Sequence, residues 1–445
     1  MKKQLLLFIS VLLSISAFAQ SDTTKSDSPT GWKFGGALPA VAYDSDVGFR
    51  YGALGYVYDW GDGSSYPDYV RSIYAEWSRT TKGSGINRIQ YDDRAFLGTN
   101  LRFFTDLAYL IEQSLDFYGY NGYQSIYNHS YEDVLSADYL SRMYYRLDRR
   151  ELKGIFDLQI PIKEDKIRGY VGVNISNMVI GSVDVDKLNK GKDPADMLPN
   201  QDTLPGLYEN YIDWGIIDPR EANGGFSTVF KGGLVFDTRD NEAWSSKGIW
   251  TEAILFGSPG IGGSSPFLQL SLTHRQYFTI FPKRLTVATR LVYQGTLAGE
   301  VPFYLRPYYF NTKEVRDAIG GSKTVRGILR DKVVADSYVF GNVELRWRVI
   351  DTKIFKQDFY IALSGFADAT MVIKPYDVDL SGVPVNLVNN YFNQDDKDLY
   401  KIHLGYGGGI RFGLNENFIV AVDYGLANDP QDGSSGMYIG LGWLF

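Results

Sequence analysis

The 445-residue sequence contains no cysteine and only three histidines. Without cysteine there can be no disulfide, thiolate metal site, cysteine nucleophile or lipid-modified N-terminal cysteine. The net charge of −7 argues against nucleic acid as a partner. The histidines lack the spacing of metal ligands, and no nucleophile lies beside a candidate base. We therefore predict no enzyme, no bound metal and no cofactor.

Long apolar runs are also scarce, because only the N-terminus carries one. The segment Met1-Lys2-Lys3, the apolar run 5–15 and the small residues around Ala19 are typical of a secretory signal peptide. We predict a signal peptide over 1–19, a short periplasmic linker over 20–31 and one domain over 32–445. Nothing after residue 20 is long and apolar enough to form a transmembrane helix.

Aromatic residues and glycine are abundant, with 33 Tyr, 15% aromatics and 47 Gly. An exported, aromatic-rich, glycine-rich chain without a spanning helix is typical of a β-barrel in the bacterial outer membrane. The lipid of that membrane is then the first expected partner.

Period-2 alternation supports this interpretation. In the segment 339–349, Val343, Leu345 and Trp347 share one face, while Glu344 and Arg346 share the other. A dry sandwich core could not accept such charges unpaired, although a soluble sandwich could turn them to solvent. The aromatic content and the signal peptide favour the barrel, in which the apolar face meets lipid and the polar face lines the lumen.

Turn signals divide the chain into about 16 strands, so the predicted fold is all-β, a single 16-stranded antiparallel transmembrane barrel. The long connections 117–140, 182–223, 299–337 and 374–398 all follow odd-numbered strands, which places them on the external side. The last strand is predicted over 435–445, with Met437, Ile439, Leu441, Trp443 and Phe445 on one face.

Several motifs resemble those of the BamA/TamA superfamily, the bacterial surface antigen family of outer-membrane assembly and translocation barrels. They are Gly320-Gly321, Val325-Arg326-Gly327, the segment 340–346, Phe366-Ala367-Asp368, and Asp237-Thr238-Arg239-Asp240. The resemblance implies that the sixth external loop enters the lumen and that Arg326 pairs there with Asp368. The alternation turns Asp368 inward, and Glu344 is a second candidate partner. A confined guanidinium needs a carboxylate, and its planar fork fits one bidentately.

The resemblance also bears on function. It implies a role in outer-membrane protein assembly, insertion or translocation, with a client β-barrel or an exported protein as partner. The chain is similar to a short barrel-only branch without POTRA domains, so a partner chain in the periplasm could supply them. Glycines at 35, 36, 440 and 442 predict a weak seam between the first and last strands. The alternative functions are a plugged or passive pore and a structural subunit of an envelope complex.

Overall fold

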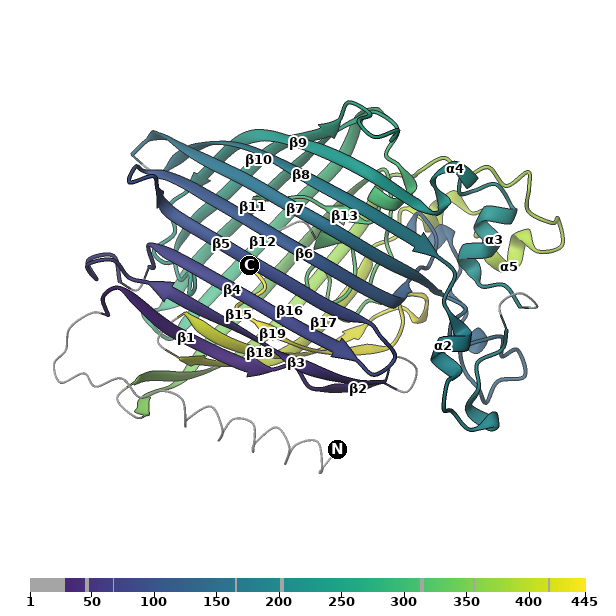
Figure 1. Ribbon diagram of the computed structural model, residues 1–445, viewed down its shortest axis with the longest axis horizontal. Coiled ribbons are helices and arrows are strands. Elements are labelled where there is room, and N and C mark those ends of the chain that lie inside the picture. Colours follow the sequence, from purple (N-terminus) through teal and green to yellow (C-terminus); the bar gives the residue numbers. More distant parts are fainter. Residues whose placement is uncertain are drawn as a thin grey trace.

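The computed structural model describes residues 29–44, 48–66, 68–164, 166–200, 204–312, 316–354, 357–414 and 417–445. The expected signal peptide, 1–19, and the linker up to residue 28 lie outside the described residues. Where described, the chain is almost entirely β-structure, curved into a barrel (Figure 1).

Within the described residues, sixteen consecutive strands form the barrel, as predicted, when β1 (Trp32–Pro39) and β2 (Ala42–Asp44) are taken as one interrupted strand. Both β1 and β2 pair with β3 (Gly48–Asp59). Antiparallel ladders then join each strand to the next along the chain. The others are β4 (Arg71–Thr80), β5 (Gly85–Phe96), β6 (Leu101–Asp116), β7 (Arg146–Lys163), β8 (Ile167–Gly181), β9 (Gly224–Asp237), β10 (Gly248–Ser258), β11 (Phe267–Phe281), β12 (Leu285–Gly299), β15 (Ser337–Ile354), β16 (Gln357–Lys374), β17 (His403–Leu414), β18 (Phe418–Ala427) and β19 (Ser435–Leu441).

The two faces of each strand confirm the barrel interpretation. On β15, Val343 and Trp347 are 52% and 51% exposed, whereas Glu344 and Arg346 are 0% and 1% exposed. Apolar side chains therefore lie outside and charges inside, which is the reverse of a soluble sandwich and the pattern of a lipid-facing barrel.

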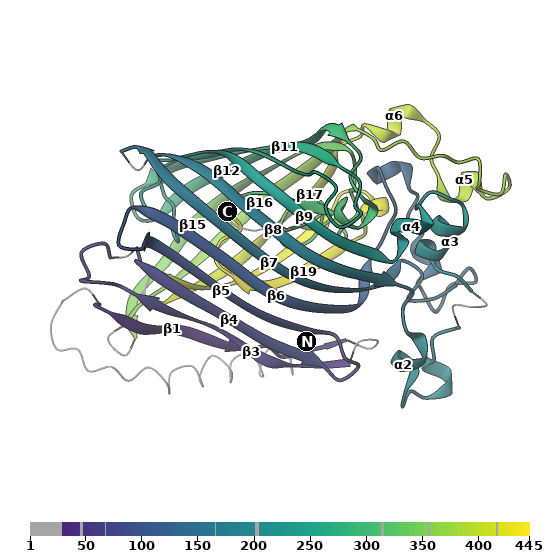
Figure 2. The same ribbon diagram turned by 45° about the horizontal axis from the view of Figure 1, so that its top comes forward.

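The two ends of the barrel differ. Short turns join the strands at one end, while the long connections and the helices of the described residues gather at the other (Figures 1 and 2). We call these the short-turn end and the long-loop end. The helices are short: α2 (Val185–Asn189), α3 (Leu207–Asp213), α4 (Pro219–Ala222), α5 (Val388–Tyr391) and α6 (Asp396–Leu399). Among the described residues, no helix has the length and hydropathy to cross a membrane.

An aromatic cap covers the long-loop end. Side chains from four different connections pack into one buried cluster, which includes Tyr120, Tyr208, Phe303 and Phe392. An isolated bridge between Ser125 and Phe392 ties the connection after β6 to the connection after β16. The sequence predicted that these connections lie on the external side, but not that they pack against one another. Aromatic packing across loops distant in sequence leaves no periodic signal, which is why the cap was not foreseen.

The prediction for the chain's end was wrong in one respect. β19 stops at Leu441 instead of continuing to residue 445, and Gly442 turns the chain with a φ of +78°. Trp443 and Phe445 are buried, not lipid-facing. Inside the lumen they pack against Arg346, whose guanidinium lies 4.5 Å from the Trp443 ring and 4.9 Å from the Phe445 ring. These cation–π contacts are the physical reason the tail leaves the sheet.

Candidate functional site: a loop held inside the lumen

The connection 300–336 is the sixth at the long-loop end, and it runs into the barrel. Its tip is a closed turn in which Gly321 N–H donates to the Ile328 carbonyl at 3.0 Å, and Gly320 N–H donates to Thr324 Oγ1 at 2.8 Å. Val325 and Ile328 are buried in an apolar cluster with β12 and β15 side chains. We call this connection the lumen loop. Its tip is anchored by its own apolar packing as well as by charge.

Arg326 is the most constrained side chain of the lumen loop. Its Nε and Nη2 donate to the two oxygens of Asp368 at 2.8 and 3.0 Å, and its backbone N–H donates to Asp368 Oδ2 at 3.1 Å. Its Nη1 lies 2.6 Å from Glu344 Oε1 and 3.4 Å from Asp423 Oδ2. The guanidinium also stacks 3.6 Å from the centre of the Phe366 ring. Arg326 is 0% exposed. Carboxylates from three strands, β15, β16 and β18, contact this one side chain.

Two further arginines balance the buried charge. Arg346 binds Glu344 at 2.8 Å, and Arg411 binds Asp423 at 2.6 and 2.9 Å. Three guanidinium groups thus face three carboxylates: Asp368, Glu344 and Asp423. Burying an unpaired charge costs several kcal/mol, roughly 3–5 kcal/mol when one partner of a buried pair is removed. Mutual neutralisation is what makes this buried cluster tolerable.

Glycines in the barrel wall let the backbone of the lumen loop approach the wall closely. A Cβ on Gly405 of β17 would lie 1.9 Å from the Arg326 carbonyl oxygen, and a Cβ on Gly425 of β18 would lie 2.6 Å from the Gly327 nitrogen. Real atoms cannot approach so closely. Glycine at these positions therefore creates the groove in which Arg326 and Gly327 lie.

A second contact holds the loop just before Arg326. Asn342 Nδ2 donates to the Thr324 carbonyl at 2.7 Å, and Arg290 Nη2 donates to the same carbonyl at 3.2 Å. Arg290 Nε in turn donates to Asn342 Oδ1 at 2.7 Å. Side chains of β12 and β15 thus bind the loop backbone directly.

The site also touches the last strand and the tail. Gly327 N–H donates to the hydroxyl of Tyr438 on β19 at 3.0 Å. Arg346, which shares Glu344 with Arg326, donates from Nη2 to the Phe445 carbonyl at 2.9 Å. A continuous series of polar contacts therefore runs from Asp368 through Arg326, Glu344 and Arg346 to the chain's end.

The structure separates the residues of the sequence motifs into two places. Val325, Arg326, Gly327, Glu344, Phe366 and Asp368 meet in the lumen, with Gly320 and Gly321 in the adjoining turn. The motif Asp237-Thr238-Arg239-Asp240 lies at the short-turn end. There Arg239 binds Asp237 at 2.9 and 2.6 Å and lies over the Trp250 ring at 3.9 Å, and Asp240 accepts from the Ser246 N–H at 2.9 Å.

Asp423, Arg411 and Tyr438 also belong to the lumen site, and sequence reasoning did not single them out. A signal for Asp423 exists, because it shares the inward face of its strand with the small residues Ala421 and Gly425. A lone carboxylate on such a face indicates a buried cation nearby.

Comparisons with known proteins agree with this architecture. The chain aligns with BamA from Haemophilus ducreyi, in a crystal structure lacking POTRA domains 1–3, at 12% identity and a TM-score of 0.51. The alignment covers 93% of this chain and 70% of that one. CdiB from Escherichia coli aligns at 9% identity and a TM-score of 0.50, over 94% of this chain and 62% of that one. No curated protein sequence matches.

At identities this low, the two structures establish the fold alone, which is that of an outer-membrane β-barrel. The family model for the Omp85 superfamily domain matches residues 96–445, most of the chain. The lumen loop, its arginine and the carboxylates that hold it all lie within the matched region, and the chain belongs to the Omp85 superfamily.

Proposed function

We propose that this barrel inserts or translocates polypeptides at the bacterial outer membrane, and that the seam between β1 and β19 opens during that process. The observation that carries the proposal is the connection between the lumen loop and the last strand. Because Gly327 binds Tyr438 and Arg346 binds both Glu344 and the tail, release of the loop weakens what holds β19.

The two strands at the seam support this proposal. β1 carries a register shift between Phe34 and Gly36 and is separated from β2 by two residues. β19 is only 7 residues long, whereas β15 and β16 have 18 each. The ladder of β1 runs to β3 and the ladder of β19 runs to β18, so each strand of the seam is held from the side away from the seam. An opened edge can then pair with an incoming strand by β-augmentation.

The alternative of a passive pore is less well supported. The aromatic cap and the lumen loop both lie across the axial path at the long-loop end. This arrangement favours low conductance in planar bilayers for the native protein. A large, steady ohmic current would favour the pore over the seam.

The test is to lock the seam with disulfides. The natural chain has no cysteine, so introduced pairs are the only thiols. A series of cysteine pairs between β1 (Trp32–Pro39) and β19 would be assayed for insertion of an unfolded β-barrel protein into liposomes. We expect oxidation to abolish activity and reduction to restore it.

A matched control bridges strands that stay paired. Val422 of β18 and Ile439 of β19 are register partners, so the pair Val422→Cys with Ile439→Cys joins two strands away from the seam. Its oxidised form should remain active. Full activity of the oxidised seam pairs would instead rule out a lateral opening.

A further inference from the structure

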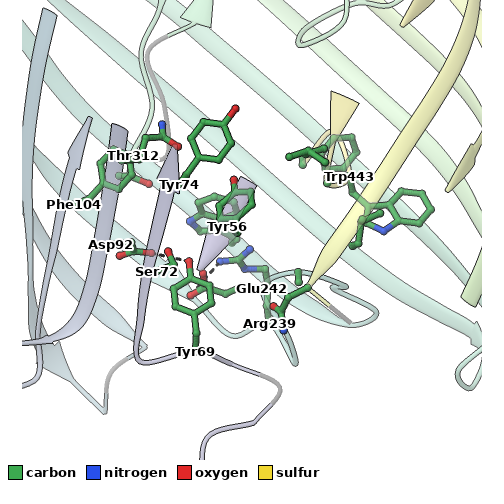
Figure 3. A pocket seen from close by; sticks show the side chains of 18 of the residues that line it. Tyr56, Tyr69, Ser72, Tyr74, Asp92, Phe104, Arg239, Glu242, Thr312 and Trp443 are labelled. Atoms are coloured by element: carbon green, nitrogen blue, oxygen red, sulfur yellow. Dashed lines mark hydrogen bonds and ion pairs between the residues drawn. The ribbon is translucent and has the colours of Figure 1, made fainter. Parts of the chain in front are cut away.

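A chamber of about 270 Å³ lies inside the barrel at the short-turn end. Its walls come from β3 to β10, from β18 and β19, from the lumen loop and from the tail 442–445. Figure 3 shows Tyr56, Tyr69 and Tyr74 on one side and Trp443 across from them. The volume is slightly below the roughly 300–1,000 Å³ of typical small-molecule pockets. It suits one or two side chains of a larger ligand.

A tyrosine stripe forms one wall of the chamber. The ring centroids of Tyr74 and Tyr56 lie 4.8 Å apart, those of Tyr56 and Tyr58 lie 5.5 Å apart, and those of Tyr58 and Tyr69 lie 5.3 Å apart. The stripe reaches the seam, because a Cβ on Gly35 of β1 would lie 2.3 Å from the Tyr58 ring. Stacked aromatic rings offer further rings an offset or edge-on partner.

On the opposite wall, the tail 442–445 is itself a peptide segment held inside the lumen. Trp443 packs 5.0 Å from Trp244, with the guanidinium of Arg411 4.7 Å from its ring. Phe445 lies 5.0 Å from the guanidinium of Arg290, and its carbonyl accepts from Arg346. Among the described residues, the buried indole N–H of Trp443 has no hydrogen-bond partner. The chain's own end is thus held through its aromatic side chains, which pack against Trp244 and against arginine guanidinium groups.

The charges of the chamber are already paired. Arg102 donates to both oxygens of Asp92, at 2.9 and 2.6 Å, and to Glu242 at 2.9 Å. Arg239 is bound to Asp237, and Arg168 and Lys323 also have partners. Guanidinium groups occupied in this way disfavour a phosphate as ligand, and carboxylates so occupied disfavour a metal ion. A ligand with aromatic and apolar groups therefore matches the chamber best.

We infer that the chamber is a polypeptide-binding site, which takes the aromatic side chains of an extended segment entering from the short-turn end. Those side chains pack on Tyr56, Tyr58 and Tyr74, across the chamber from Trp443 (Figure 3). The inference rests on the proposed function for the source of the segment, a client chain. The inference adds to that function a first binding site for the client chain, which is the chamber.

The probe is a peptide with the sequence of Ile439–Phe445, labelled at its N-terminus with a fluorophore, added to the full chain in detergent micelles. We expect saturable binding, and loss of binding when alanine replaces the peptide's Trp and Phe. The double variant Tyr56→Leu with Tyr74→Leu should bind about tenfold more weakly, since it loses two aromatic contacts. Tyr170→Leu changes a buried lumen tyrosine outside the chamber and should bind normally.

A second measurement remains informative if a tyrosine variant misfolds. Gln90 lines the chamber and Gln113 lines a different lumen cavity. A photoreactive benzoylphenylalanine at position 90 should capture the aromatic peptide, whereas the same group at 113 should not. Absence of binding, equal binding of the alanine peptide, or equal capture at both positions would each overturn the inference.

The seam-locked protein separates this inference from the proposed function. Because the peptide enters from the short-turn end, locking the seam should leave peptide binding unchanged while client insertion stops. If insertion continues with the seam locked, the proposed function fails and the chamber can still bind peptide. If the peptide does not bind but locking stops insertion, only the chamber assignment fails.

Discussion

Two walls of the same lumen both carry pairs of arginine with a carboxylate, but these pairs differ in how far they are buried. On the wall formed by β15 to β18, Asp368 and Glu344 are fully buried against Arg326 of the lumen loop, which is fully buried too. On the wall formed by β3 to β7, Arg88 binds Asp106 at 2.5 Å, but Arg88 remains 18% exposed beside a cavity of about 280 Å³. The lumen loop covers the first wall, whereas the second wall faces a cavity at Arg88. The loop reaches the second wall farther along, where its Arg330 and Asp317 pair with Glu112 and Arg149.

The contrast shows which wall depends more on its ion pairs for stability. Removing one partner of a buried ion pair leaves an uncompensated charge, whereas water can solvate a charge that faces a cavity. Glycines complete the first wall by admitting the loop backbone, whereas the loop meets the second wall through ion pairs of Arg330 with Glu112 and of Asp317 with Arg149. The backbone at Arg326 and Gly327 therefore lies against the first wall.

The largest expected effect comes from breaking the covered wall. Arg326→Ala should lower the free energy of unfolding by about 3–5 kcal/mol, because three carboxylates lose their shared cation. Unfolding by denaturant in micelles measures this. Asp368→Ala should have a similar effect, and the double variant should lose much less than the sum of the two. Strict additivity would mean that the two side chains act independently.

Filling the groove should have the next largest effect. Gly405→Ala places a Cβ against the Arg326 carbonyl, and overpacking of this kind typically costs about 1–3 kcal/mol. Gly365→Ala on β16 is the matched control, since a Cβ there meets nothing within 4 Å. Limited proteolysis of the lumen loop reports its release. Equal protection of the two variants would contradict the close approach of the loop.

A third prediction concerns Lys332 in the lumen loop, which donates to the backbone carbonyls of Gly122 and Ser125 at 3.2 and 2.9 Å. Burial lowers the pKa of Lys332 to about 8, partly opposed by the charge of Asp432. The unfolded chain then holds this proton more tightly than the folded chain does. The free energy of unfolding should therefore rise, by roughly 3 kcal/mol, between about pH 8 and pH 10.5.

The control for this pH dependence is Lys332→Met, which keeps the length of the side chain and removes the proton. Comparing denaturant unfolding of both proteins across the same pH range isolates the contribution of Lys332. Identical slopes in the two proteins would show that other groups cause the dependence.

The smallest effect is expected on the second wall. Arg88→Ala should cost about 1 kcal/mol, since Asp106 gains access to the cavity. The same denaturant experiment measures it beside Arg326→Ala. A cost equal to that of Arg326→Ala would erase the difference between the two walls.

The barrel was predictable because alternation is local and repeated in every strand. The direction of the lumen loop depended on a resemblance carried by a few residues, Arg326 and Asp368 among them. The tail was not predictable, since the alternation of Met437, Ile439 and Leu441 continues through Trp443 and Phe445 without a break. Arginines from distant strands override that pattern, and their positions are known only once the barrel is folded.

Bilayer conductance of native protein, Arg326→Ala, Asp368→Ala and the double variant tests the central claim most directly. If the pair holds the loop in the lumen, both single variants show larger or noisier currents than native, and the double variant adds little. Currents indistinguishable from native in all three variants would contradict the claim that this pair holds the loop.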